Sequence, residues 1–351
     1  MIWLTWRQFR GSAALMGAVL TAVGLMLVLT GPGLADEYAA GIADCAVNGR
    51  CDRFYSAFFG RHDLAFLSVT LVVLLLPALV GLFWGAPLIT RELESGTHLL
   101  VWNQSVTRTR WLAVKLALIG LVVMAATCLL GLAVTWWSGP LDRSADDGWA
   151  LMSPLVFDAR GIVPMAYAAF GFVLGIVVGL LARRTLAAMA LTLLIFTGVQ
   201  LAVPLLVRPH LQPPIRASVE LTAANVDGFS READGLGLHL RNQVPTDTGA
   251  WVLSSRLADP AGRVMAEDET ISLSGDLALA CTPSGPPPEA GRADPMAACF
   301  AELNRLGYRQ AVTYHPTSAF WPFQWIETGI YALFTAGLAW LSFWLIRRRA
   351  S

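Results

Sequence analysis

The sequence predicts an all-α polytopic membrane protein with six transmembrane helices and a small α+β extracellular domain between the fifth and the sixth. Of its 351 residues, 55% are hydrophobic and only 14% are charged, whereas about 25% of the residues of an average soluble domain are charged. Six apolar runs without Asp, Glu or Arg also reach the length of about 20 residues that crosses a bilayer core. This composition excludes an ordinary soluble enzyme.

The apolar runs divide the chain into three predicted parts. Residues 1–207 hold an N-terminal interfacial helix and transmembrane helices one to five, residues 208–320 form the extracellular domain, and residues 321–351 form the sixth transmembrane helix with a basic cytoplasmic tail. The runs themselves lie at residues 11–33, 64–90, 111–141, 161–182, 185–207 and 328–346.

The N-terminal segment allows more than one interpretation. Residues 1–10 contain Trp3, Trp6, Arg7 and Arg10, a pattern that predicts a short amphipathic helix in the membrane interface. A plain continuation of the first span is the alternative. We expect no cleaved signal peptide, because the apolar run that follows is longer than the roughly 7 to 15 residues of a signal sequence.

Charge placement predicts the orientation in the membrane. If the N-terminus is cytoplasmic, eleven basic residues but only two acids, Glu92 and Glu94, fall on the cytoplasmic side. Cytoplasmic loops carry an excess of Lys and Arg, so both termini are expected in the cytoplasm of a multi-pass cell-membrane protein. The basic residues are Arg7, Arg10, Arg91, Arg108, Arg110, Lys115, Arg183, Arg184, Arg347, Arg348 and Arg349.

Four of the five cysteines fall outside the membrane on this topology, and Cys128 falls inside the third span. Disulfides persist in oxidising compartments outside the cytoplasm. We therefore predict the pairs Cys45–Cys51 and Cys281–Cys299, although four cysteines allow three pairings and free thiols remain an alternative.

The segment between the fifth and sixth spans is long enough for a small domain. Alternating stretches at 251–255 and 311–314 predict strands, residues 283–291 predict a loop, and residues 295–306 predict a helix. Asp294 suits the N-cap of that helix and Pro295 its first position. Nine arginines against thirteen acids argue against nucleic acid as a partner.

Small and polar residues inside the spans are candidates for helix contacts or for a transport path. Gly171, Gly175 and Gly179 recur every four residues, and Gly81 and Gly85 form a shorter copy. Such a face lets another helix backbone approach closely, either as a moving contact or, as we favour, as static packing. Two further candidates for a gate or path are Gln200, deep in the fifth span, and Glu327, at the outer start of the sixth, where the helix N-terminus would partly offset its charge.

The sequence lacks the motifs by which a transporter would bind ATP or couple transport to an ion gradient. A P-loop requires Gly-Lys-Ser/Thr, but the only lysine, Lys115, lies between Val114 and Leu116. No ionisable residue lies near the middle of a span, where ion-coupled pumps usually carry one. Any transport would thus draw its energy from another subunit, and we expect no catalytic, cofactor or metal site in this chain.

Two motifs resemble a known family. One runs from Arg91-Glu92 through Glu94, Gly96-Thr97 and Ser105-Val106-Thr107-Arg108 to Trp111 and Lys115. The other precedes the last span, with Tyr314-His315-Pro316 and then Phe320 to Thr328. Together with the six-span layout, these motifs resemble the permease subunits of the type-2 ABC exporters, in their actinobacterial version.

The resemblance implies partners and a coupling loop. In such permeases the loop between spans two and three docks onto a nucleotide-binding subunit, so Glu92, Glu94, Gly96, Thr97 and Arg108 would belong to that contact. A solvated basic loop is the simpler alternative. The resemblance also implies ABC ATPase subunits that hold ATP and Mg, a second permease copy in a homodimer or heterodimer, and contact with membrane lipid.

The sequence thus predicts the membrane subunit of an ATP-driven ABC exporter. Its apolar spans favour an amphipathic or lipid-like substrate. The alternative is a membrane-anchored enzyme or a ligand-binding sensor whose outer domain carries the activity. Candidate residues for the enzyme are Asp227, His239, Asp268 and His315, but their spacing forms no recognisable site.

Overall fold

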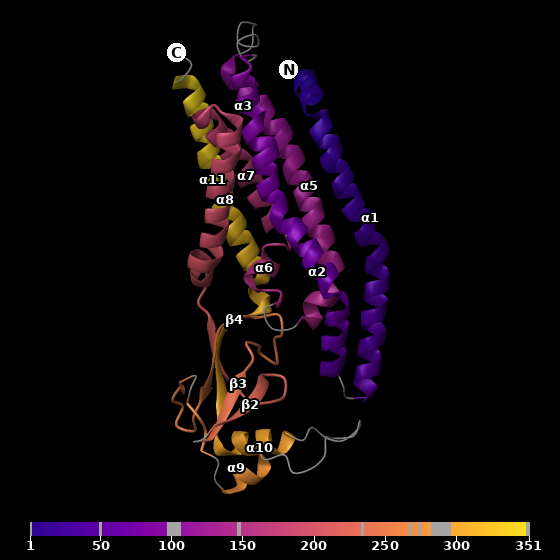
Figure 1. Ribbon diagram of the computed structural model, residues 1–351, viewed down its shortest axis with the longest axis vertical. Coiled ribbons are helices and arrows are strands. Elements are labelled where there is room, and N and C mark those ends of the chain that lie inside the picture. Colours follow the sequence, from indigo (N-terminus) through magenta and orange to yellow (C-terminus); the bar gives the residue numbers. More distant parts are fainter. Residues whose placement is uncertain are drawn as a thin grey trace.

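The computed structural model describes residues 2–48, 51–96, 107–145, 149–232, 235–266, 269–272, 275–281 and 296–348. Within these residues six helices are long and apolar enough to cross a membrane. They form an elongated bundle, with a smaller region of strands and short helices at one end (Figure 1). Both chain ends lie at the opposite end. We call these the domain end and the terminal end of the bundle.

The first two spans are longer than the apolar runs that predict them. Helix α1 runs without a break over Ile2–Asn48 and α2 over Cys51–Val80. No boundary therefore separates residues 2–10 from the first span, since neither Gly11 nor the internal Pro32 ends the helix. The predicted first loop is also much shorter than expected, because the Ala-rich stretch after Gly33 continues the helix. The Cys45–Cys51 disulfide is confirmed and joins the two helix ends.

The second span continues past Pro77 through a π-helical turn, η1 (Gly81–Gly85), into α3 (Ala86–Glu94). The third span is α5 (Arg108–Ser144). A short helix, α6 (Pro154–Phe157), then precedes α7 (Val163–Ala182), the fourth span. The fifth comprises α8 (Thr185–Ala202), a second π-helical turn η2 (Val203–Val207) and a 3-10 turn η3 (Arg208–His210). After the domain, the 3-10 turn η4 (Thr317–Ala319) leads into α11 (Phe320–Arg348).

Helix α7 lies at the centre of the bundle, in contact with α2, α3, α5, α8 and α11. Nearly all of its residues are buried. The surrounding helices instead expose large apolar side chains on their outer faces, including Leu29, Leu75, Leu129, Leu194 and Leu333. Exposed apolar surface of this extent marks contact with a nonpolar partner, which agrees with helices surrounded by lipid.

The region after the fifth span contains five strands: β1 (Ile215–Val219), β2 (Val226–Glu232), β3 (Gly235–Leu240), β4 (Trp251–Ala258) and β5 (Arg309–His315). An antiparallel sheet has the order β1-β5-β4, with Tyr314 opposite both Ile215 and Val252. Strands β2 and β3 form a separate hairpin. The sequence predicted β4 and β5 but missed the first three strands.

Two helices, α9 (Gly275–Ala280) and α10 (Ala297–Leu306), complete this region. Cys281 and Cys299 form the second predicted disulfide, and both are buried with Leu221, Leu236 and Leu303 in a separate apolar core. The predicted loop 283–291 and the proposed cap Asp294 with Pro295 lie outside the described residues.

Close packing of α7 depends on its glycines. A Cβ on Gly175 would lie 2.5 Å from the Gly81 carbonyl oxygen and 2.6 Å from the Ala86 nitrogen. A Cβ on Gly81 would lie 2.6 Å from the Gly171 carbonyl oxygen, and one on Gly179 would lie 3.0 Å from the Ala86 carbonyl oxygen. Backbones this close leave no room for a side chain. The glycine face of α7 therefore contacts the η1 turn of the same chain.

Gly175→Ala should consequently destabilise the bundle, by about 1–3 kcal/mol in free energy of unfolding, because the added methyl group overpacks two backbones. Thermal unfolding of the detergent-purified protein measures the effect. Gly198→Ala is the matched control, because no heavy atom lies within 4 Å of a Cβ at that position. Equal losses in the two variants would contradict the close-packing argument.

Candidate functional site

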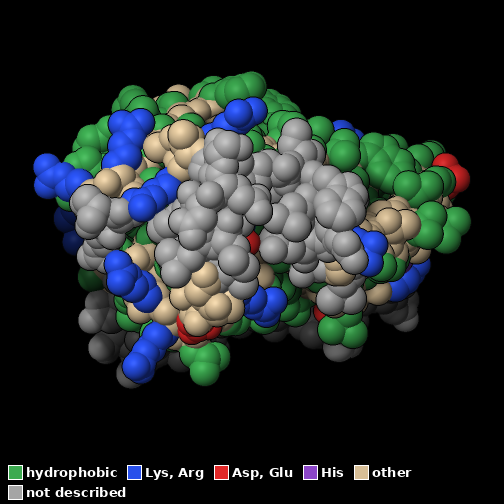
Figure 2. Space-filling model, turned by 90° about the horizontal axis from the view of Figure 1, so that it is seen from above, with side chains coloured by type: hydrophobic (Ala, Val, Ile, Leu, Met, Phe, Trp, Pro, Cys, Tyr) green, Lys and Arg blue, Asp and Glu red, His purple; other side chains and the backbone are tan. Residues whose placement is uncertain are grey.

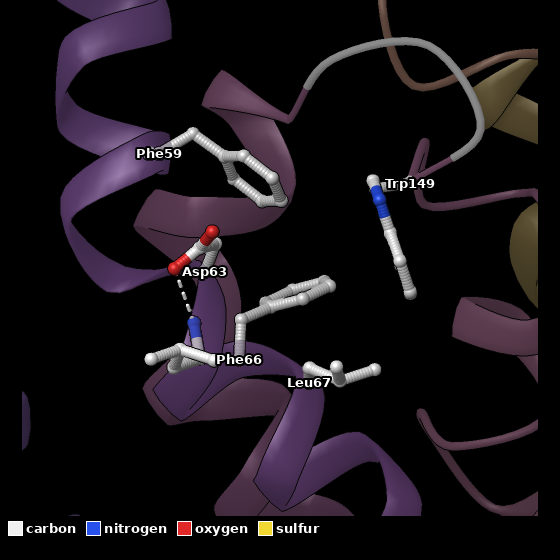
Figure 3. A pocket seen from close by; sticks show the side chains of 7 residues that line it. Phe59, Asp63, Phe66, Leu67 and Trp149 are labelled. Carbon is white, nitrogen blue, oxygen red and sulfur yellow. Dashed lines mark hydrogen bonds between the residues drawn. The ribbon is translucent and has the colours of Figure 1, made fainter.

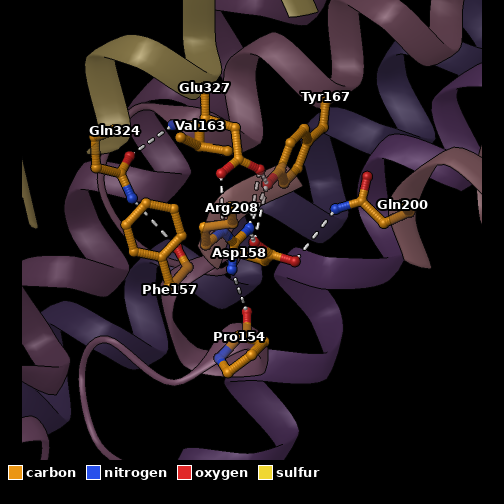
Figure 4. Close-up of polar contacts among 9 residues, drawn as sticks. All are labelled: Pro154, Phe157, Asp158, Val163, Tyr167, Gln200, Arg208, Gln324 and Glu327. Atoms are coloured by element: carbon orange, nitrogen blue, oxygen red, sulfur yellow. Dashed lines mark hydrogen bonds and ion pairs between the residues drawn. The ribbon is translucent and has the colours of Figure 1, made fainter. Parts of the chain in front are cut away.

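Buried polar side chains gather near the domain end of the bundle (Figure 4). Arg208 and Glu327 are fully buried, and Asp158 and Tyr167 are almost so. They come from four segments: η3, α11, the residue after α6, and α7. We call these four residues the Arg208 cluster.

Local backbone structure brings the cluster together. The π-helical turn η2 immediately precedes Arg208, and such turns change the direction in which the following side chains point. Pro154 occupies the first turn of α6, where its missing N–H costs nothing, and Asp158 caps the other end of this short helix. Glu327 lies roughly two turns inside α11.

Arg208 binds both carboxylates. Its Nε and Nη2 donate to the two oxygens of Glu327, each at 2.9 Å, and Nη2 also pairs with Asp158. The Tyr167 hydroxyl contacts Asp158 at 2.9 Å and also bonds Glu327. The Phe157 ring lies 4.4 Å from the guanidinium carbon. Nη1 donates to the Pro154 carbonyl oxygen at 3.4 Å, so each guanidinium nitrogen has an acceptor.

The cluster holds two carboxylates against one guanidinium. Taking charges out of water is costly and is compensated only by close pairing and full hydrogen bonding. Asp158 lies in the connection before the fourth span, and burial raises its pKa. The charge of the Glu327 carboxylate raises this pKa further, whereas the Arg208 guanidinium lowers it. Gln200 extends the network, with its Nε2 3.5 Å from Asp158 Oδ2. The arrangement connects spans four, five and six at their domain ends.

Two neighbouring contacts reinforce this level of the bundle. Arg160 is fully buried and pairs with Asp142 of α5 at 3.3 Å, and it also reaches Thr70 of α2. Gln324 of α11 accepts hydrogen bonds at 3.0 Å from the backbone N–H groups of Ile162 and Val163. These N–H groups lie at the start of α7 and have no partner within their own helix.

The terminal end contains a second set of contacts, around the predicted coupling loop. Glu92 of α3 pairs with Lys115 of α5 at 2.6 Å, and the Lys115 ammonium lies 4.5 Å from the Trp111 ring. Glu94, the last residue of α3, accepts hydrogen bonds at 2.7 Å from the backbone N–H and the hydroxyl of Thr185 at the start of α8. Helix α3 is thereby connected to both α5 and α8.

The residues on either side of the predicted coupling loop have defined conformations. Gly96 has a φ of +69°, the left-handed conformation that commonly follows a helix C-terminus. Arg108 is the first residue of α5, and the Thr107 side chain caps this helix by accepting a hydrogen bond from the Arg110 N–H. Thr97 lies outside the described residues.

The terminal end is basic. Figure 2 looks onto this end and shows Lys and Arg side chains around its rim, with only small areas of acidic side chains in view. The exposed arginines among the described residues of this end are Arg10, Arg91, Arg110, Arg183, Arg184, Arg347 and Arg348.

Several sequence expectations need correction at this site. Arg208, predicted within the outer domain, is part of the bundle, because the fifth span continues to His210. Glu327 is not at a helix N-terminus; α11 begins at Phe320, and Arg208 neutralises the Glu327 charge. The sequence analysis singled out Gln200 and Glu327 but missed Asp158, Tyr167 and Arg208. Asp158 and Arg208 lie near the ends of apolar runs, where charged residues ordinarily mark the membrane interface, so their positions along the chain gave no sign of burial.

The residues proposed for an outer enzyme do not meet in one place. His315 is buried between Trp251 and Phe323, whereas Asp227 pairs with Arg241 in the β2–β3 hairpin region. Asp268 lies outside the described residues. Among the described residues, no group of His, Cys, Asp and Glu is arranged to hold a metal ion.

Comparison with known proteins gives one match. A family model described as ABC-2 membrane transporter related matches residues 17–208, more than half of the chain. The match extends from α1 to Arg208, so the inserted domain and α11 lie beyond it. No curated protein and no solved structure matches the chain.

Replacing Arg208 by Met should lower the free energy of unfolding by about 3–5 kcal/mol, because it leaves two buried carboxylates without their cation. Adding Asp158→Asn and Glu327→Gln should restore part of the loss. Thermal unfolding of the single and combined variants measures both effects. Arg305→Met, which breaks the exposed pair with Glu302, serves as control and should cost at most about 1 kcal/mol. Failure of the added changes to restore any stability would contradict the assignment.

Acidification should weaken the junction between domain and bundle through His315. Burial lowers the pKa of His315 below its ordinary value of 6.5, although the Pro209 carbonyl opposes this. The pKa of His315 is therefore lower in the folded protein than in the unfolded protein. The stabilisation from keeping His315 neutral is complete above pH 6.5, and it is lost as the pH falls through the pKa of His315 in the folded protein. His315→Gln should therefore show a smaller fall in unfolding temperature between pH 7.5 and about pH 5 than the wild type. His210→Gln, at an exposed histidine of the same junction, should behave like the wild type; an identical pH response in all three proteins would refute the prediction.

Proposed function

The chain belongs to the ABC-2 membrane transporter related family, and from this premise we propose that it is the membrane-spanning permease subunit of an ATP-driven ABC exporter. A multi-pass membrane transport subunit follows from the family and the six apolar helices. The source of energy, the direction of transport and the substrate class are part of the proposal. The observation that carries it is the set of contacts that connects α3, just before the loop between α3 and α5, to the third and fifth spans.

The proposed orientation places the terminal end in the cytoplasm and the strand region outside. The excess of exposed arginines at the terminal end supports this orientation, since cytoplasmic segments carry the basic residues of membrane proteins. The disulfide within the strand region supports it as well, because disulfides are rare in the cytosol.

The proposed energy transfer begins at the loop between α3 and α5. A separate ABC ATPase would bind this loop, and movement of the loop would pull on α3. Glu92 transmits that movement to α5 through Lys115, and Glu94 transmits it to α8 through Thr185. Glu92 and Glu94 are thus proposed as residues that hold the root of the loop, with Gly96, Thr97 and Arg108 closer to the partner.

The proposed substrate is amphipathic or lipid-like, and a second permease copy completes the passage. Six spans make half of the set that an exporter of this kind would need. The apolar outer faces of α1, α2, α5, α8 and α11 offer surface for both a second copy and membrane lipid.

Breaking the Glu92–Lys115 pair should uncouple the ATPase. We expect Glu92→Gln and Lys115→Met each to reduce the ATP hydrolysis that the permease stimulates in its co-purified ABC ATPase by about tenfold, the equivalent of one charge-assisted hydrogen bond. The double variant should lose no more, because both changes break the same pair. Hydrolysis is measured in reconstituted membranes after the partner has been identified by mass spectrometry.

The control for this experiment is Glu37→Gln, which breaks a pair with Arg61 in the half of the bundle nearer the domain end and should leave hydrolysis unchanged. A loss in Glu92→Gln with normal coupling in Lys115→Met would mean that Glu92 contacts the partner directly. Normal coupling in both variants, or absence of any ABC ATPase from the purified complex, would contradict the proposal.

Cysteine labelling tests the orientation. A cysteine introduced at Ala261, in an exposed turn after β4, should react with a membrane-impermeant maleimide in intact cells. A cysteine at Ser95, at the end of α3, should react only after the membrane is opened. The reverse pattern would place the strand region in the cytoplasm and refute the proposed export direction.

A further inference from the structure

An aromatic pocket of about 350 Å³ lies beside α2, in the half of the bundle nearer the domain end (Figure 3). Its volume is within the range of about 300–1,000 Å³ that small-molecule sites occupy. It shares no residue with the Arg208 cluster or with the coupling loop. Its lining residues are Phe59, Gly60, Asp63, Leu64, Phe66, Leu67 and Trp149.

The periodicity of α2 builds one wall of this pocket. Phe59, Asp63, Phe66 and Leu67 follow one another at intervals of four, three and one, so they share one face of the helix. The opposite wall is Trp149, from the connection between α5 and α6. The Phe66 ring meets Trp149 edge-on, with centroids 6.0 Å apart, and meets Phe59 at 5.3 Å. Three aromatic rings therefore surround one space.

The pocket also carries a negative charge. One oxygen of Asp63 accepts a hydrogen bond from the Leu64 backbone N–H at 2.5 Å, and no ion pair to Asp63 exists within the described ranges of the chain. Arg160 lies 4.9 Å from the Phe66 ring centroid, but Asp142 neutralises it. Asp63 is also exposed to solvent. Among the described residues, Asp63 is thus a carboxylate without an opposing cation at the opening of the aromatic pocket.

We propose that this pocket binds an organic cation of the quaternary or tertiary ammonium class. Aromatic faces attract such cations through their quadrupoles, and a carboxylate nearby adds direct charge attraction. A simple metal ion would lack the several oxygen ligands that it requires, and Asp63 would repel an anion.

The position of Asp63 indicates the rest of the ligand. It is the last charged residue before the apolar run 64–90. Leu64, Leu71 and Leu75 of the same helix are exposed beyond it. An ammonium head in the pocket would leave an apolar tail free to lie along these side chains within the lipid. The preferred ligand is therefore an amphiphilic cation; its role as cargo rests on the proposed function, whereas its binding does not.

Calorimetric titration of the purified full-length chain in a neutral maltoside detergent tests the proposal without any ATPase. Choline is the probe, and 3,3-dimethylbutan-1-ol, which replaces the ammonium nitrogen by carbon, is the uncharged comparison. We expect saturable choline binding at one site, with at least about tenfold weaker binding of the alcohol, because only the cation gains from the rings and the carboxylate.

Two variants locate the site. Asp63→Asn and Trp149→Leu should each weaken choline binding about five- to tenfold, with thermal unfolding measured alongside to show that both proteins are folded. Asp36→Asn removes an exposed acid on α1 that does not line the pocket and should bind choline like the wild type. Equal binding of the alcohol and choline, unchanged binding in Asp63→Asn, or no saturable binding would each overturn the proposal. Because no nucleotide or partner is present, these outcomes do not bear on whether the chain serves an exporter.

Discussion

The burial of Arg208 between Asp158 and Glu327 is the interaction on which the arrangement of the molecule depends. Arg208 is the residue at which the fifth span approaches its end, and Glu327 lies in the first turns of the sixth. The whole strand region is inserted between these two residues. Their pairing at 2.9 Å joins the two chain connections to the domain, the end of the fifth span and the start of the sixth, which we call the roots of the domain. Tyr167 links these roots to α7, and Asp158 links them to the end of α6. These contacts fix both connections of the domain to the bundle.

Helix α7 gives the bundle a rigid axis between its two polar levels. Its glycines bring the backbone into direct contact with η1 and the start of α3, so these segments have little freedom to slide. At the terminal end, α3 is joined to the neighbouring helices through side-chain contacts, Glu92 with Lys115 and Glu94 with Thr185. In the proposed mechanism, ATP-driven movement would start at these side-chain contacts and would meet a closely packed backbone core.

The sequence was sufficient for what depends on hydrophobic length and on local pattern. The six spans, both disulfides and strands β4 and β5 followed from apolar runs, cysteine placement and alternation. It failed where distant charges decide the structure. Asp158 and Arg208 are separated in sequence and flank apolar runs like ordinary interfacial residues, so nothing local showed that they meet Glu327 in the interior. The length of α1 was underestimated for a related reason: polar residues such as Asp36 and Glu37 end an apolar run but do not end a helix.

Hydrogen–deuterium exchange in the Arg208→Met variant tests most directly whether this one residue holds both roots of the domain. The account predicts faster exchange, relative to the wild type, in two separate segments: residues 204–211 at the end of the fifth span and residues 317–328 at the start of the sixth. The middle of α5, residues 123–134, should exchange as before. Faster exchange confined to residues 204–211, with residues 317–328 unchanged, would show that the two roots are held independently and would contradict the account.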